Sequence, residues 1–192
     1  MAANPNRVVM SVEEYLELDR NSLDTRYEFI DGVVTMLAGG TTKHSRICVN
    51  MVSQLHTALR GKPCQVFNSD LRVSISRTRY VYPDASVSCD PHDLEEEGDI
   101  IYYPRVIIEV LSPSTEASDR GKKFSYYRSC PTIQEYVLIS TQEQAVDVYR
   151  RASDNLWTLH PFGPSEVVTL KSINVSIPMD DFYEDVTFPE SV

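Results

Sequence analysis

Two carboxylates stand inside apolar stretches of the chain. Glu109 interrupts the run from Val106 to Leu111, and Asp84 interrupts the run from Val81 to Val87. A buried charge in such a setting costs several kcal/mol unless it is paired or bound to a metal. If the two segments are neighbouring strands, both carboxylates can converge on one hard cation such as Mg²⁺. The alternative is that each carboxylate caps a turn or pairs with an arginine.

A helix expected after Glu109 adds a lysine to this picture. Asp119 and Lys123 are four residues apart and share one helical face, which Tyr127 continues. A helix that directly follows a strand can pack over the C-terminal end of that strand. Lys123 could then place its ammonium group beside a metal-bound water near Glu109. The alternative is a surface ion pair that contributes roughly a few tenths of a kcal/mol.

Glu28 and His44 are weaker candidates for the same site. Glu28 is a further acid in an apolar setting, between Tyr27 and Phe29. His44 begins an expected helix, where a histidine commonly acts as a cap or lies on the surface. The chain carries neither a G-x-S-x-G turn nor a Cys–His signature that would mark a nucleophile.

The periodicity of apolar residues predicts the elements that must position these side chains. Ser11 and Glu14 have the spacing of a capping box, and Asp31–Gly32 is typical of a tight turn. The expected elements are a helix over 11–18, a strand pair over 27–37, a helix over 44–59, strands over 65–75, 80–87 and 105–111, a helix from Thr115 or Ser118 to about 129, a hairpin of 135–140 with 145–150, and short edge strands over 156–160 and 167–170. This order predicts an α/β or α+β domain around a mixed sheet.

Length and charge narrow the class of protein. A chain of 192 residues without repeat or linker predicts one domain. The formal net charge of −10 argues against indiscriminate nucleic-acid binding. The acids are concentrated in 90–99 and in the C-terminal segment, whereas Arg120, Lys122, Lys123 and Arg128 form a local basic cluster. A basic cleft on an acidic body therefore remains open.

Cysteine usage and hydropathy bear on the compartment. The four cysteines Cys48, Cys64, Cys89 and Cys130 include no C-x-x-C pair, which argues against a zinc site built on thiolate pairs. We interpret all four as reduced structural residues, mostly buried. No apolar run approaches the roughly 20 residues of a membrane helix, and the N-terminus does not resemble a secretory signal. These features predict a cytoplasmic protein without a membrane partner.

The ordered set of motifs resembles the Uma family of restriction-endonuclease-like proteins, which belongs to the PD-(D/E)XK nuclease superfamily. The resemblance covers roughly residues 8 to 185, and its most specific parts are the E-V-L-S-P-S-T and D-x-x-x-K motifs at this spacing. The matching segments are Arg26–Gly32 and His44, Tyr80–Asp84, Ile107–Thr115, Asp119–Phe124 with Tyr127, and Glu135–Leu138.

The resemblance implies a restriction-endonuclease-like fold, a mixed β-sheet flanked by helices with a metal site at its centre. Asp84 matches the aspartate of the P-D motif and Glu109 matches the following carboxylate. Leu111 stands where the simple motif has lysine, and Lys123 on the next helix matches the displaced lysine of the Uma pattern. Glu28 matches an acid that the superfamily often carries near its first strand or helix.

The implied reaction is hydrolysis of a DNA phosphodiester. Asp84 and Glu109 would hold Mg²⁺ or Mn²⁺, with the Val110 carbonyl as a further ligand. Lys123 would orient or deprotonate a water, or stabilise the transition state. Glu28 would bind a second cation or position the first, and His44 would contact phosphate.

Two other functional hypotheses remain besides that of a nuclease. The same fold could serve as a catalytically silent module that binds nucleic acid or protein, or as a metal-binding protein with another substrate, because fold does not fix function. We expect one domain over residues 8–185, with flexible termini over 1–7 and 186–192. A homodimer is expected because nucleases that cut both strands often dimerise.

Overall fold

A computed structural model describes residues 9–95 and 97–188 of the chain. In chain order its elements are α1 (Val12–Asn21), β1 (Tyr27–Ile30), β2 (Val33–Met36), α2 (Thr42–Leu59), β3 (Gln65–Asn68), β4 (Arg72–Ser76), β5 (Arg79–Val81), β6 (Ala85–Ser88), η1 (Pro91–Leu94), β7 (Ile100–Ile101), β8 (Pro104–Val110), α3 (Glu116–Ser118), η2 (Asp119–Lys123), α4 (Phe124–Ser129), β9 (Glu135–Ile139), β10 (Val146–Arg151), η3 (Ser153–Asn155), β11 (Trp157–Phe162), β12 (Val167–Leu170), η4 (Lys171–Ile173), β13 (Val175–Pro178) and α5 (Met179–Phe182). Of the termini expected to be flexible, residues 1–7 and 189–192 lie outside the described residues.

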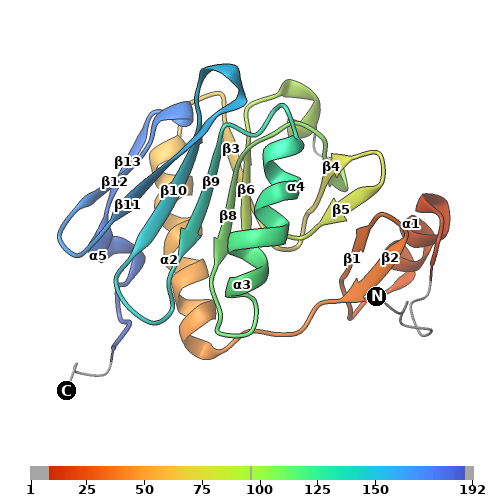
Figure 1. Ribbon diagram of the computed structural model, residues 1–192, viewed down its shortest axis with the longest axis horizontal. Helices are drawn as coiled ribbons and strands as arrows, with labels where there is room; N and C mark the ends of the chain where they lie inside the picture. Colours follow the sequence, from red (N-terminus) through yellow and green to blue (C-terminus); the bar gives the residue numbers. More distant parts are fainter. Residues whose placement is uncertain (1–8, 96, 189–192) are drawn as a thin grey trace.

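A six-stranded sheet, here called the large sheet, forms the centre of the fold in the order β11-β10-β9-β8-β6-β3. Its pairs are antiparallel except β8 with β9, which run parallel. Parallel neighbours need a crossover connection, and the helical run from α3 through η2 to α4 provides it. The expectation of a mixed sheet flanked by helices is confirmed, and Figure 1 shows α2 and α4 on opposite sides of this sheet.

Alternation along β8 divides the core between the two faces of the large sheet. Val106, Ile108 and Val110 belong to the apolar cluster that also contains the buried side chains of α2. Ile107 and Leu111 belong to a second cluster with residues of α4 and β9. A strand covered on both faces explains the near-continuous apolar run in the sequence. Glu109 lies on the second face, beneath the helical run.

Helix α2 begins at Thr42, before the predicted start at His44, and has the predicted end at Leu59 and the predicted apolar face. The hydroxyl of Thr41 accepts a hydrogen bond of 3.2 Å from the backbone N–H of His44, which caps the first turn. Ile47, Met51, Leu55 and Leu59 are buried against the large sheet. Burial of each such side chain contributes about 1.5–3 kcal/mol relative to exposure. This packing fixes the first turn of α2 over the end of β8.

A second sheet, here called the small sheet, has the order β2-β1-β5-β4-β7 and carries α1. The expected turn at Asp31–Gly32 joins β1 to β2, with positive φ at both residues. The expected capping box of Ser11 and Glu14 begins α1. Figure 1 shows α1, β1 and β2 at one end of the molecule.

A buried ion pair attaches α1 to the small sheet. Asp19 of α1 lies 2.5 Å from the guanidinium of Arg72 on β4, and both side chains are almost fully buried. The hydroxyl of Tyr82 also donates to Asp19. Because Tyr82 stands two residues before Asp84, this contact anchors the segment that carries the first candidate carboxylate.

Two segments expected as single strands each divide between the sheets. The segment 65–75 becomes β3 of the large sheet and β4 of the small sheet, separated at Asn68, whose side chain accepts a hydrogen bond from the N–H of Asp70. The segment 80–87 becomes β5 and β6, which leave one sheet for the other at Pro83. Proline has no N–H to donate to a ladder, which favours such a break. The short β7 and the strand β13 were not predicted.

The expectation that all four cysteines are reduced is wrong for two of them. A disulfide joins Cys64 to Cys89, whose Cα atoms lie 4.0 Å apart. The two residues flank β3 and β6, and the register Gln65 opposite Ser88 continues one step to place them face to face. Sequence spacing does not reveal this pairing, because it depends on strand register. Cys48 and Cys130 are free.

None of the helices in the described parts of the chain has both the length and the apolar character needed to cross a bilayer.

The disulfide closes a loop across 25 residues, so its loss should destabilise the fold. The chain-entropy account gives about 3–4 kcal/mol for a loop of this size. We expect a reducing agent to lower the midpoint of urea unfolding, and Cys64→Ala/Cys89→Ala to do the same. The reducing agent should have no further effect on the double variant. Four reactive thiols in the unfolded, unreduced protein would contradict the pairing.

Candidate active site

The candidate residues meet where the two sheets adjoin. Asp84 lies in the link from β5 to β6, and the register Ala85 opposite Ile108 continues one step to place it opposite Glu109. Glu28 comes from β1 of the small sheet. Lys123 comes from η2, a π-helical turn within the helical run. Such turns often occur at functional sites.

The ammonium of Lys123 is surrounded by carboxylates. Its Nζ atom lies 3.1 Å from Glu109 Oε1, 3.3 Å from Glu28 Oε1 and 3.7 Å from Asp119 Oδ1. The Asp119 side chain is almost completely buried, so this pair is not the surface ion pair that was the alternative reading. We call Glu28, Asp84, Glu109 and Asp119 the acidic cluster.

Glu109 is held as a buried acceptor. The hydroxyl of Tyr127 donates to Glu109 Oε1 at 2.7 Å, and Lys123 donates to the same oxygen. Burial raises the pKa of Glu109 to about 8; the charge of Lys123 opposes this shift, and the other members of the acidic cluster add to it. Burial lowers the pKa of Lys123, but the carboxylates of Glu109, Glu28 and Asp119 outweigh it, so the net direction is upward. The lysine therefore carries its charge at neutral pH.

Asp84 is positioned by the end of β8 and the start of α2. The backbone N–H of Val110 donates to Asp84 Oδ2 at 2.7 Å, and His44 Nε2 lies 3.4 Å from the same oxygen. The hydrogen bond to Asp84 raises the pKa of His44. A Cβ atom at Gly40 would lie 2.8 Å from His44 Nδ1, so the glycine leaves room for the ring.

Two oxygens of the acidic cluster lack hydrogen-bond partners among the described residues. Glu28 Oε1 and Asp119 Oδ1 are buried, and the nearby Lys123 does not meet either with hydrogen-bond geometry. Buried polar atoms are rarely left unpaired. Four carboxylates also exceed the charge of one lysine. Carboxylate oxygens are the ligands that Mg²⁺ and Mn²⁺ prefer, so the donor set fits a hard divalent cation.

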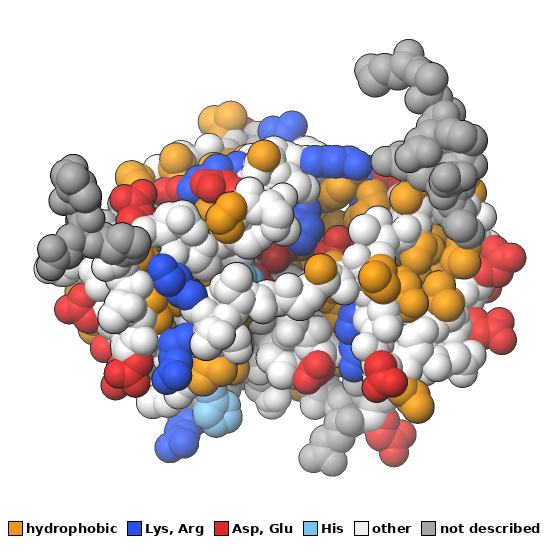
Figure 2. Space-filling view, turned by 90° about the horizontal axis from the view of Figure 1, so that it is seen from below, with side chains coloured by type: hydrophobic (Ala, Val, Ile, Leu, Met, Phe, Trp, Pro, Cys, Tyr) orange, Lys and Arg blue, Asp and Glu red, His pale blue; other side chains and the backbone are white. Residues whose placement is uncertain are grey.

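A cavity of about 800 Å³ gives access to these groups from solvent. Its lining includes both expected carboxylates, Asp84 and Glu109, together with His44, Asp119 and Lys123. The loop from Ser112 to Thr115 and the segment from Met36 to Thr41 form much of its rim. Figure 2 shows a hollow in the face of the molecule, with acidic side chains at its bottom. The cavity is large enough for an extended polar ligand.

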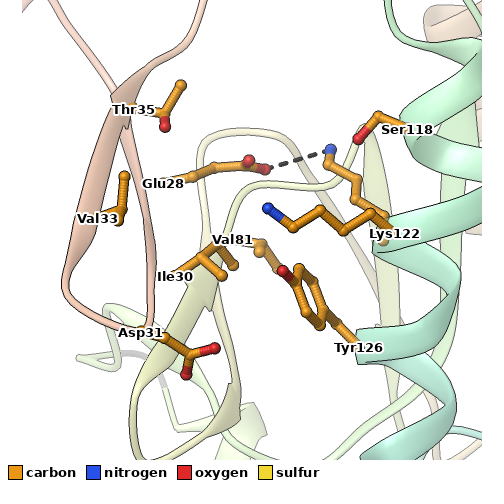
Figure 3. Close-up of a pocket in the computed structure, with 10 residues that line it drawn as sticks. Glu28, Ile30, Asp31, Val33, Thr35, Val81, Ser118, Lys122 and Tyr126 are labelled. Carbon is orange, nitrogen blue, oxygen red and sulfur yellow. Dashed lines mark ion pairs between the residues drawn. The ribbon is translucent and has the colours of Figure 1, made fainter. Parts of the chain in front are cut away.

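Lysines 122 and 123 both line a second cavity of about 410 Å³ together with Glu28, and of the two only Lys123 also lines the 800 Å³ cavity. The ammonium of Lys122 lies 5.8 Å from the ring centroid of Tyr126. Figure 3 shows Glu28 reaching from β1 toward the helical run, where the dashed line marks its ion pair with Lys123. Lys123 forms ion pairs with three members of the acidic cluster, and within the described residues Lys122 forms none with it.

Three further residues belong to this site by position. Asp119 and Tyr127 share the helical face of Lys123, a spacing visible in the sequence. Cys48 Sγ lies 3.5 Å from His44 Nδ1, which the i, i+4 spacing on α2 could have indicated. Burial raises the pKa of Cys48, with the charge of Asp84 adding to the shift. The thiol is therefore a poor nucleophile at neutral pH.

Comparison with known sequences places the chain in a family. Residues 12–180 match Uma2, whose description is "Putative restriction endonuclease". The chain belongs to the Uma2 family. Two uncharacterized proteins of Synechocystis sp. (strain ATCC 27184 / PCC 6803 / Kazusa) are similar to this Uma2 protein. One is 38% identical over 93% of this chain and 94% of its own length, and the other is 30% identical over 79% and 86%.

A solved structure from Anabaena variabilis ATCC 29413 shares the fold of this Uma2 protein. It is described as "a putative nuclease belonging to DUF820" and superposes with a TM-score of 0.76. The match covers 93% of this chain and 99% of the other, at 23% identity. The Uma resemblance expected from the motifs is confirmed, and the chain has a nuclease-like fold.

The excess negative charge of the acidic cluster should destabilise the cation-free protein. Glu109→Gln removes one charge and keeps an oxygen that can accept from Tyr127. When folding raises the pKa of a carboxyl group, the folded protein loses stability as the pH rises toward and through that pKa. Without divalent cations, the variant should therefore exceed the wild type in unfolding free energy, by about 1–3 kcal/mol near pH 9 and less near pH 6.

Urea unfolding in chelator at both pH values measures this difference. The exposed Glu143→Gln is the matched control and should show no pH-dependent gain. A wild type that is more stable than Glu109→Gln at the higher pH would show that Lys123 fully compensates the cluster.

Proposed function

We propose that this Uma2 protein is a metal-dependent endonuclease that hydrolyses DNA phosphodiester bonds. The observation that carries the proposal is the convergence of Asp84, Glu109 and Lys123 at the bottom of the 800 Å³ cavity. The family description and the nuclease-like fold support it. The residues that would do the chemistry are assigned by their contacts and their match to the motif.

Asp84 and Glu109 are the proposed ligands of Mg²⁺ or Mn²⁺. They stand opposite each other on neighbouring strands, and the cavity gives access to both. The Val110 carbonyl is retained as a proposed further ligand. When bound, the cation would supply a Lewis acid for the phosphoryl oxygens and lower the pKa of water.

The chain fixes both carboxylates before any ligand arrives. The Val110 N–H holds Asp84 Oδ2, and the Tyr127 hydroxyl holds Glu109 Oε1. Each acceptor is thereby oriented by a group that packing already constrains, because Tyr127 is fully buried and Val110 ends a central strand. Such preorganisation reduces the reorganisation needed during catalysis.

Lys123 has the charge and the position to act on the attacking water or on the phosphate. Its ammonium lines the cavity beside Glu109 and is protonated at neutral pH. In that state it donates hydrogen bonds and stabilises negative charge that develops on phosphoryl oxygens. We therefore assign it electrostatic stabilisation and water orientation in preference to abstraction of a proton.

Glu28 and His44 have supporting roles in this proposal. Glu28 neutralises Lys123 from the small sheet through Oε1, and the same oxygen, which has no hydrogen-bond partner among the described residues, offers a ligand atom to a second cation. His44 lies beside Asp84 at the edge of the cavity, and its raised pKa favours the charged ring that would contact a phosphate. Cleavage of both strands would require a second active site, so we include a homodimer in the proposal.

The acidity of the chain favours one alternative function. A net charge of −10 weakens electrostatic attraction to a polyanion. A catalytically silent module would keep the fold and bind nucleic acid or protein through the same cavity. Such a module would bind its partner equally well in chelator, whereas the proposed nuclease requires the cation for turnover.

Substitution of Asp84 tests the cation site. We expect Asp84→Asn to abolish Mg²⁺-dependent plasmid nicking, by at least about 100-fold, and to weaken Mn²⁺ binding measured by titration calorimetry. Asp70→Asn is the matched control, because Asp70 lines the same cavity and its carboxylate accepts a hydrogen bond from Asn68. If Asp84→Asn still nicks plasmid with Mg²⁺ but not in chelator, residues other than Asp84 hold the catalytic cation.

Substitution of the two neighbouring lysines tests the displaced lysine. Lys123→Met should lower kcat by at least about 100-fold while Mn²⁺ binding is kept or strengthened, because an ammonium leaves the acidic cluster. Lys122→Met removes an ammonium that lines the 410 Å³ cavity but not the 800 Å³ cavity, and it should keep kcat within a few-fold. Parallel melting curves separate a loss of chemistry from a loss of folding. Equal effects of both substitutions would contradict the assignment.

A further inference from the structure

A second set of metal ligands adjoins the proposed magnesium site and includes a thiol. His44 and Cys48 lie one turn apart on α2, with Nδ1 and Sγ separated by 3.5 Å. The other ring nitrogen, Nε2, lies 3.4 Å from Asp84 Oδ2. One ligand atom from each residue can be chosen so that all three lie within 4.8 Å of one another.

These spacings suit a small tetrahedral ion. Zinc binds cysteine sulfur at about 2.3 Å, histidine nitrogen at about 2.0–2.1 Å and carboxylate oxygen at about 2.0–2.2 Å. Ligand atoms around such an ion stand roughly 3.3–3.8 Å apart. The 3.5 Å and 3.4 Å separations involve different ring nitrogens of His44, and one zinc ion binds only one of them. With one ligand atom from each residue the three donors lie within 4.8 Å of one another, so closing the site needs side-chain movements of roughly 1 Å.

The identity of the donors separates this set from the acidic cluster. Carboxylates alone favour Mg²⁺ and Mn²⁺, whereas a thiolate and an imidazole favour zinc and its neighbours late in the transition series. The thiol of Cys48 is free, because the disulfide joins Cys64 and Cys89. His44, Cys48 and Asp84 all line the 800 Å³ cavity, which leaves a path for an ion and an open fourth position.

We propose that His44, Cys48 and Asp84 bind Zn²⁺, and that this zinc inhibits the enzyme by taking Asp84 from the catalytic cation. The inhibitory part rests on the proposed nuclease function, because Asp84 is shared between the two sites. The binding part rests on the three donors alone. Zn²⁺ is expected to inhibit the Mg²⁺-dependent reaction at concentrations far below those of Mg²⁺, because only zinc gains the thiolate ligand.

Cobalt is a direct probe of the binding part, since Co²⁺ bound to a thiolate gives a sulfur-to-metal charge-transfer absorption. Co²⁺ titrated into the unreduced full-length protein should produce this absorption, and Zn²⁺ should remove it. Cys48→Ser should abolish the absorption. His44→Gln and Asp84→Asn should weaken Co²⁺ binding by at least about tenfold.

Matched controls lie on the same helix and among the same cysteines. His56→Gln changes an exposed histidine of α2, and Cys130→Ser removes the other free thiol. Both variants should keep the wild-type absorption. If the absorption persists in Cys48→Ser, or never forms in the wild type, the zinc site is wrong.

Thiol labelling provides a second measurement that does not depend on Cys48→Ser folding correctly. In the Cys130→Ser protein, Zn²⁺ should slow alkylation of Cys48 at least about tenfold, whereas Mg²⁺ should not. An unchanged alkylation rate with saturating Zn²⁺ would overturn the site.

Nicking assays then test inhibition separately from binding. Zn²⁺ added to the Mg²⁺-activated wild type should suppress nicking, and Cys48→Ser should remain active at the same Zn²⁺ concentration. Equal suppression of both proteins would show that zinc inhibits elsewhere. If no nicking occurs under any condition while the cobalt absorption depends on Cys48, the proposed function fails and the zinc site stands.

Discussion

The contacts of the Lys123 ammonium with buried carboxylates constrain the rest of the structure. They join the small sheet through Glu28, the large sheet through Glu109 and the helical run through Asp119. Each of these carboxylates is expensive to bury alone, and one lysine reduces the cost for all three. The lysine thus holds together elements that are distant in the sequence. It leaves the acidic cluster with excess negative charge, which is the condition for binding a cation.

The frame around this cluster explains how such a charge arrangement can persist. The central strand β8 has apolar side chains packed on both faces, and α2 and the helical run cover those faces. Interiors packed to this density resist small displacements. The strands can therefore hold Asp84 and Glu109 opposite each other although the two groups repel. Stability lost at the site is offset by apolar burial elsewhere, a pattern common at functional sites.

Asp84 is a proposed ligand in both the catalytic cation site and the zinc site. On one side it faces Glu109 and the oxygen donors of the acidic cluster, and on the other it faces His44 and Cys48. The first environment suits hard divalent cations and the second suits zinc. One aspartate placed between two donor sets makes the choice of metal a competition. The same chain can then combine a catalytic cation with an inhibitory one without a separate regulatory domain.

The sequence by itself determined the features that depend on local pattern. Residue types and spacing predicted the apolar run of β8 with its interrupting glutamate and the common helical face of Asp119, Lys123 and Tyr127. They also predicted the capping box of α1 and the turn between β1 and β2. These succeeded because side-chain periodicity and turn geometry act over a few residues. The matched motifs also indicated the family, because their order extends over most of the chain.

Only the tertiary structure decided which distant residues meet. The division of 65–75 and 80–87 between two sheets, and the pairing of Cys64 with Cys89, follow from strand register, which local pattern does not specify. The contacts of Lys123 with Glu109 and Glu28 follow from the rotation of the helical run on the sheet. The approach of Cys48 to Asp84 depends on the packing of α2 across β8, over a separation that no spacing rule covers. Long-range packing, not local preference, completed the site.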